Sequence, residues 1–114
     1  MEPDQQRLLD LHRRLLAGDR VATEAVISAL LTPLSQEIQR KYPRTDAHQV
    51  GEGVTDALLD YCERPATFDA TRNVPLDRFL SQAAWSNVRD LLRGEKLRKL
   101  REETRFELVR IQRR

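Results

Sequence analysis

The stretch DAHQVGEGVTDALLDYCE, residues 46–63, decides the fold of this chain. Its apolar residues recur at steps of three and four, which is the period of an amphipathic α-helix. Asp46 offers a side-chain acceptor at the start and Gln49 follows three residues later, as in a capping box. Arg64-Pro65 ends the segment, because the residue before a proline is pushed away from helical backbone angles. The predicted helix buries a stripe made of Val50, Val54, Ala57, Leu58 and Tyr61.

The same period continues on the N-terminal side, where we predict helices over residues 4–17 and 20–41. Gly18 suits the left-handed position that ends a helix, and Asp19 supplies an N-cap oxygen for the next one. Pro33 lies inside the second pattern and predicts a kink, or a short break near Thr32, because proline cannot donate a backbone hydrogen bond. The buried stripe of this second helix is predicted to be Val21, Ala25, Ile27, Ala29, Leu30, Leu34 and Ile38.

On the C-terminal side, an irregular segment over residues 65–75 precedes a fourth helix that opens near Pro75 and runs through Arg93. Gly94 is expected to bend or end it. Residues 95–114 are predicted to be a charged helical extension or the start of an interdomain linker, with apolar positions at Leu97, Leu100, Leu108 and Ile111. No strand-like alternation occurs. We therefore predict an all-α fold, a compact bundle of four to five helices over residues 1–94, with the charged extension beyond it.

Composition narrows the class of protein. The 114 residues are 39% hydrophobic and 33% charged, which suits one domain with one core. No run approaches the roughly 20 apolar residues of a membrane span, and no secretory leader precedes Asp4. Cys62 is the only cysteine, which excludes intramolecular disulfides and cysteine-based zinc sites. We expect a soluble, cytoplasmic protein with no membrane partner, metal or cofactor.

The net charge of +2 hides an asymmetry along the chain. Residues 1–88 hold 10 Lys/Arg and 13 Asp/Glu, whereas residues 89–114 hold 10 and 5. An acidic segment followed by a basic segment indicates two partners of different charge. A basic terminal helix that is simply exposed to solvent would give the same distribution of charged residues.

The residues offer little catalytic chemistry. His12 and His48 lie on different predicted helices without a paired nucleophile, and no metal-ligand spacing or phosphate-binding glycine loop occurs. Glu52, Asp56 and Asp60 share one helical face, as solvated carboxylates or carboxylates facing a basic partner do. Cys62 is interpreted as a part-buried filler. We expect no enzyme and no catalytic residue.

Nucleic-acid binding has more support, from the irregular segment and the fourth helix. Arginine and lysine neutralise phosphates, asparagine pairs with base edges, and an exposed tryptophan can stack on an unpaired base. Phe79 falls in the apolar stripe and is expected in the core, so Trp85 is the better candidate for stacking. The predicted DNA-binding residues are Arg72, Asn73, Arg78, Trp85, Asn87, Arg89, Arg93 and Lys96.

The order of these segments resembles region 2 of bacterial RNA polymerase sigma factors of the extracytoplasmic-function type. The similarity spans about residues 14–100. It rests on Leu16-Ala-Gly-Asp19, on the stretch from Val50 to Tyr61, on Phe68-Asp69 with the polar segment after it, and on Phe79-Leu80, Ala83-Ala84 and Asp90-Leu-Leu-Arg93.

The resemblance implies a transcription initiation factor domain that binds core RNA polymerase and recognises and melts the −10 promoter element. The acidic helix would dock on the clamp helices of the largest polymerase subunit, the segment 68–75 would approach a flipped base, and the fourth helix would hold the upstream edge of the element. An anti-sigma factor is a possible further partner. The polymerase-binding residues it implies are His48, Glu52, Val54, Asp56 and Leu58.

Two other interpretations remain open. The chain could be a helical interaction or regulatory module that dimerises through its C-terminal helix and binds no nucleic acid. It could also be a helical anti-sigma domain. The first predicts a dimer that is lost when the chain is shortened to Arg93, and the second predicts competition for a sigma factor.

Overall fold

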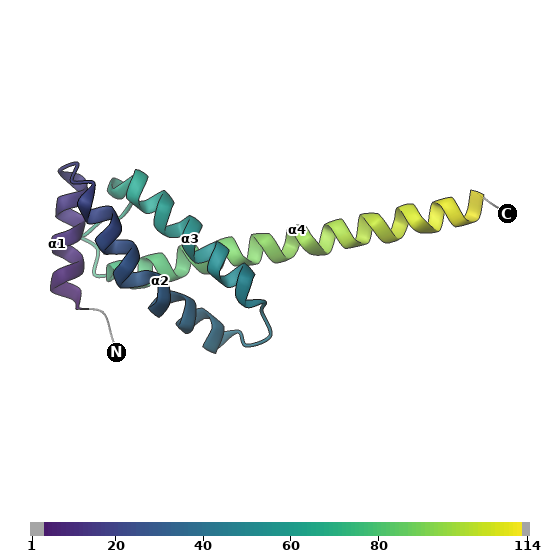
Figure 1. Cartoon of the computed structure of the whole chain (residues 1–114), viewed down its shortest axis with the longest axis horizontal. Helices are drawn as coiled ribbons and strands as arrows, with labels where there is room; N and C mark the ends of the chain where they lie inside the picture. The colour runs from purple at the N-terminus through teal and green to yellow at the C-terminus, as the bar shows by residue number, and fades with distance from the viewer. Residues whose placement is uncertain (1–3, 113–114) are drawn as a thin grey trace.

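The computed structural model describes residues 4–112, and within that range the chain forms helices and no strand (Figure 1). The prediction of an all-α fold is confirmed. Residues 113 and 114, the end of the predicted extension, lie outside the described residues. The elements are α1 (Gln5–Leu16), α2 (Val21–Lys41), α3 (Ala47–Glu63), the 3-10 turn η1 (Pro65–Thr67) and α4 (Leu76–Gln112).

Side-chain acceptors define the starts of the helices. The Asp4 carboxylate accepts from the backbone N–H of Gln6 at 3.0 Å, and the Asp46 carboxylate accepts from that of His48 at 2.7 Å. Gly18 has the positive φ of 86° expected between α1 and α2. Arg20, not Asp19, holds the N-cap position of α2, but the Asp19 carboxylate still accepts from the Val21 N–H at 3.0 Å. These bonds satisfy N–H groups that a helix cannot pair internally.

The core is formed by one face of each helix. Leucines of α1, small and branched residues of α2 and α3, and the first half of α4 meet in one cluster, which Phe68 closes after η1. The central members are Leu8, Leu11, Ala22, Val26, Leu30, Leu34, Ile38, Val50, Val54, Leu58, Leu76, Leu80 and Ala84.

In α2 the predicted stripe is wrong over its first half. Val21 is 67% exposed, whereas Ala22 and Val26 are fully buried. The segment has apolar residues on several sides, so its period alone does not select the face that packs on α1 and α3. The predicted break near Thr32 is also absent, since α2 is helical through Pro33.

A glycine allows α3 and α4 to pack closely. A Cβ atom built on Gly53 would lie 2.5 Å from Cγ2 of Val88 and 3.1 Å from the carbonyl oxygen of Ala84. The Asn87 amide, beside this contact, donates to the Gly53 carbonyl oxygen at 3.1 Å. The crossing is therefore built from the smallest side chain on α3 and small or branched side chains on α4.

Helix α4 continues far beyond the bundle (Figure 1). The helix does not end at Gly94, and it continues without a break for 37 residues. The Gln49 amide donates to the Glu95 carboxylate, and after this residue the described side chains of α4 are exposed. The molecule consequently measures 67 × 28 × 24 Å. Among the described residues no helix is both long and apolar enough to cross a membrane.

Candidate functional site

The outer face of α3 is acidic. Glu52, Asp56 and Asp60 are all exposed and lie within about 80° of one another around the helix. His48, one turn before Glu52, is also exposed. Three of the predicted polymerase-binding residues, His48, Glu52 and Asp56, therefore share one accessible face.

The other two predicted polymerase-binding residues require correction. Val54 and Leu58 are 0% and 1% exposed and belong to the core. They lie on the side of α3 that packs on the other helices, because they share its period with Val50 and Tyr61. Neither side chain can reach a partner in the folded domain.

An apolar contact surface exists beside the acidic face, on residues that the sequence interpretation missed. Leu59 is 46% exposed, and it borders a small hollow of about 30 Å³ together with Ile27 and Leu31 of α2. Successive residues are about 100° apart on a helix, so two adjacent leucines point in different directions. The pair Leu58-Leu59 was thus the signal in the sequence for an exposed apolar residue on this helix, since one leucine is buried and the other faces solvent.

The basic residues of α4 form a stripe on the side of the helix that faces away from the core. Four of the predicted DNA-binding cations fall within about 60° of one another and along about 27 Å of the helix. All four are exposed, and none takes part in an ion pair among residues 4–112. We call this set the basic stripe; it consists of Arg78, Arg89, Arg93 and Lys96.

Trp85 borders the basic stripe but is not a free platform. It is half-buried, and its ring stacks on that of Tyr42, with centroids 3.6 Å apart and planes 3° from parallel. Tyr42 follows the last residue of α2, so the pair joins the end of α2 to the middle of α4. A base could stack here only beside this pair or by displacing Tyr42.

Asn87 does not belong to the stripe. It is half-buried and its amide is bonded to the Gly53 carbonyl oxygen of α3. Around the helix it lies about 160° from Arg89. The prediction that Asn87 contacts DNA is therefore corrected: this side chain holds α3 against α4.

The segment between η1 and α4 presents Arg72 and Asn73 to solvent. The Asp69 carboxylate accepts from the Thr71 hydroxyl at 2.6 Å and from the Thr71 N–H at 2.9 Å. These bonds lower the pKa of Asp69 below its usual value. The loop starts from buried Phe68, so Arg72 and Asn73 project from an anchored turn.

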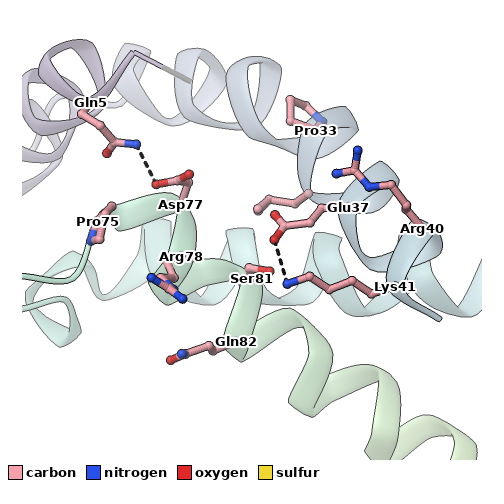
Figure 2. A pocket seen from close by; sticks show the side chains of 11 residues that line it. Gln5, Pro33, Glu37, Arg40, Lys41, Pro75, Asp77, Arg78, Ser81 and Gln82 are labelled. Atoms are coloured by element: carbon pink, nitrogen blue, oxygen red, sulfur yellow. Dashed lines mark hydrogen bonds and ion pairs between the residues drawn. The ribbon is translucent and has the colours of Figure 1, made fainter. Parts of the chain in front are cut away.

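A groove of about 690 Å³ lies between the second half of α2 and the start of α4 (Figure 2). Its acidic side chains are partnered: Glu37 pairs with Lys41 at 3.2 Å, and Asp77 accepts from the Gln5 amide at 3.0 Å. Arg40 and Arg78 line it from different helices, α2 and α4. The fold thus places Arg40 in the same groove as Arg78, the first residue of the basic stripe, although the two residues are far apart in the sequence.

The buried polar group of the core is His12. Its Nδ1 is hydrogen-bonded to the Tyr61 hydroxyl at 2.6 Å, and its ring meets that of Phe68 edge to face with centroids 5.0 Å apart. Burial lowers the pKa of His12 and raises that of Tyr61. Cys62 is half-buried, and burial raises the pKa of its thiol, which opposes thiolate formation.

Across residues 4–112 no group of three or more His, Cys, Asp or Glu side chains is arranged to hold a metal ion. The surfaces described above therefore present charge and apolar contact rather than a metal centre. Comparisons with protein-family models, curated proteins and solved structures found no match for this chain.

Proposed function

We propose that this chain is a sigma region 2-like domain that binds core RNA polymerase through α3 and promoter DNA of the −10 element through α4. The observation that carries the proposal is the separation of charge between these two helices. The carboxylates of α3 lie on one exposed face, and the basic stripe lies on the side of α4 that faces away from α3.

The DNA half of the proposal rests on the geometry of the cations. Four unpaired cations in a row of about 27 Å can each neutralise a phosphate along one strand. Arg40 extends this row into the groove beside Arg78, and the loop adds Arg72 and Asn73 at the start of α4. Bases freed from the duplex would be held near the Tyr42–Trp85 stack, where aromatic surface lies beside positive charge.

The polymerase half rests on a different surface. Glu52 and Asp56 border the apolar patch formed by Leu59 and Ile27. An exposed leucine within a carboxylate face fits a partner helix that carries both basic and apolar residues.

The DNA half is tested with single-stranded oligonucleotides of −10 sequence by fluorescence anisotropy over a range of salt. The double variant Arg89→Ala/Arg93→Ala removes two charges from the basic stripe. It should weaken binding and reduce the slope of log K against log salt by about 1.4, since each single-strand phosphate contact contributes about 0.7. The matched control is Arg98→Ala/Arg105→Ala, which removes the same charge from other faces of α4. Equal loss in both double variants would contradict the proposed stripe.

The polymerase half is tested by pull-down with core RNA polymerase. Glu52→Lys should weaken retention by reversing one charge of the acidic face, and Leu59→Ala should weaken it by removing apolar contact. Glu107→Lys makes the same charge change on the protruding part of α4 and should have no effect. Retention of Glu52→Lys and Leu59→Ala at the level of the unmodified protein would remove α3 as the docking face.

A second candidate function is the helical interaction module that binds no nucleic acid. The exposed apolar side chains after residue 95 favour it, because a solvated helix has no need of them. This interpretation is preferred if the unmodified chain binds neither the oligonucleotide nor the polymerase.

A further inference from the structure

The protruding part of α4 exposes an unusual amount of apolar surface. Residues 95–112 extend about 27 Å at 1.5 Å per residue and protrude from the bundle (Figure 1), and the side chains from Lys96 onward are exposed. Isolated helices of this length are marginal in water, so a helix that stays intact here gains from a partner. The exposed large side chains are Leu97, Leu100, Phe106, Leu108, Val109 and Ile111.

Five positions of this segment form a symmetric stripe. Leu97, Leu100, Thr104, Leu108 and Ile111 follow one another at steps of 3, 4, 4 and 3. At 100° per residue they fall within about 80° of one another. The spacing reads the same in both directions from Thr104.

That symmetry is what a two-fold contact between antiparallel helices requires. In such a contact residue i meets residue j while j meets i. With the axis at Thr104, Leu97 of one protomer lies level with Ile111 of its partner, and Leu100 lies level with Leu108. Every apolar residue of the stripe then faces an apolar residue, and Thr104 faces its own copy.

Charge also favours the antiparallel direction. Residues 96–101 carry four Lys/Arg and no Asp or Glu, whereas residues 107–112, which lie level with them in the antiparallel pair, carry one Arg and one Glu. Antiparallel pairing therefore sets the basic segment of one helix beside a segment without net charge, whereas parallel pairing would set basic against basic. The bundles then lie at opposite ends of the paired helices, where they do not collide.

We propose that residues 95–112 of α4 are the interface of an antiparallel homodimer centred on Thr104. This proposal does not depend on the proposed function, because its stripe, Leu97 to Ile111, follows the basic stripe along α4 and shares no residue with it. The paired segment is shorter than a standard interface, so we expect a dissociation constant of about 10–100 μM.

Sedimentation equilibrium of the full chain between 5 μM and 1 mM tests the dimer. Leu100→Glu/Leu108→Glu places charge in the stripe and should raise the dissociation constant at least tenfold. Phe106→Glu/Val109→Glu makes the same kind of change on the opposite side of the helix and should not. A chain that is monomeric at 1 mM, or equal losses in the two double variants, would overturn the proposal.

Disulfide cross-linking tests the direction of the pairing. In a Cys62→Ala background, a mixture of the Leu97→Cys and Ile111→Cys chains should oxidise to a mixed dimer, and Leu97→Cys alone should stay monomeric. All of these positions except Cys62 are exposed, so folding is not at risk. Cross-linking of Leu97→Cys to itself, without the mixed product, would show parallel helices and contradict the arrangement proposed.

Discussion

Gly53 and Gly51 are two residues apart on α3 and have opposite surroundings. A methyl group at Gly53 would collide with Val88 of α4, whereas a methyl group at Gly51 would meet nothing within 4 Å. Glycine in a helix costs about 1 kcal/mol relative to alanine. At position 53 a glycine is needed, because only a residue without a side chain lets α3 approach α4 this closely. At position 51 the packing does not require a glycine.

The two alanine variants should therefore move stability in opposite directions. Gly51→Ala should raise the free energy of unfolding by up to about 1 kcal/mol. Gly53→Ala should lower it by about 1–2 kcal/mol, because the strain of overpacking exceeds the helix-propensity gain. Urea unfolding followed by circular dichroism measures both. Stabilisation by Gly53→Ala would mean that α3 and α4 do not approach as described.

His12 should make the fold sensitive to acid. Burial lowers its pKa in the folded state below 6.5, its ordinary value. Above that value the histidine is neutral in both states and has no effect. As the pH falls below 6.5 the unfolded chain takes up a proton that the folded chain resists, so stability declines.

The measurement is the free energy of unfolding at pH 7.5 and pH 5 for the unmodified chain and for His12→Gln. Glutamine can still hydrogen-bond to the Tyr61 hydroxyl but does not titrate. We expect a larger loss between the two pH values in the unmodified chain. Parallel losses would show that other groups cause the pH dependence.

At the scale of the elements, α4 consists of a part that packs in the bundle and a part that is exposed to solvent. Its first part packs through Leu76, Leu80, Ala84 and Val88, whereas residues after Glu95 are exposed. The charged side chains of the second part form i,i+3 and i,i+4 pairs, such as Lys99 with Glu95 at 3.9 Å, and such pairs add only a few tenths of a kcal/mol.

Removal of residues 97–114 should consequently leave the bundle intact. At 5 μM, where most chains are monomeric at the proposed dissociation constant, the free energy of unfolding should change by less than about 0.5 kcal/mol. The helical circular dichroism signal should fall, because the protruding helix is lost. A large drop in stability would show that this segment packs on the bundle in solution.

At the scale of the whole molecule, the acidic face of α3 and the basic stripe of α4 are separate surfaces on opposite sides of the α3–α4 contact. Substitutions far apart with no shared partner act independently. We expect Glu52→Lys to leave oligonucleotide affinity within about twofold, and Arg89→Ala/Arg93→Ala to leave polymerase retention unchanged. The two binding assays of the proposed function measure this. A variant that changes both would indicate one continuous surface.

Much of the helical architecture could be predicted from the sequence because it depends on local interactions. The cap at Asp46, the turn at Gly18 and the stripe from Val50 to Tyr61 involve residues a few positions apart. The alternative that α4 ends at Gly94 is wrong, because glycine lowers helix propensity by an amount that its good helix-forming neighbours outweigh.

The candidate site depended more on tertiary structure. The basic stripe follows from helical period alone, and so does the exposure of Glu52 and Asp56. The period also placed Leu58 in the buried stripe of α3, but it left open which face of α2 meets the core. The packing of the helices on one another decided that point, because it sets which residues distant in the chain come into contact. Only that packing stacks Trp85 on Tyr42, joins Asn87 to Gly53 and places Arg40 and Arg78 in one groove.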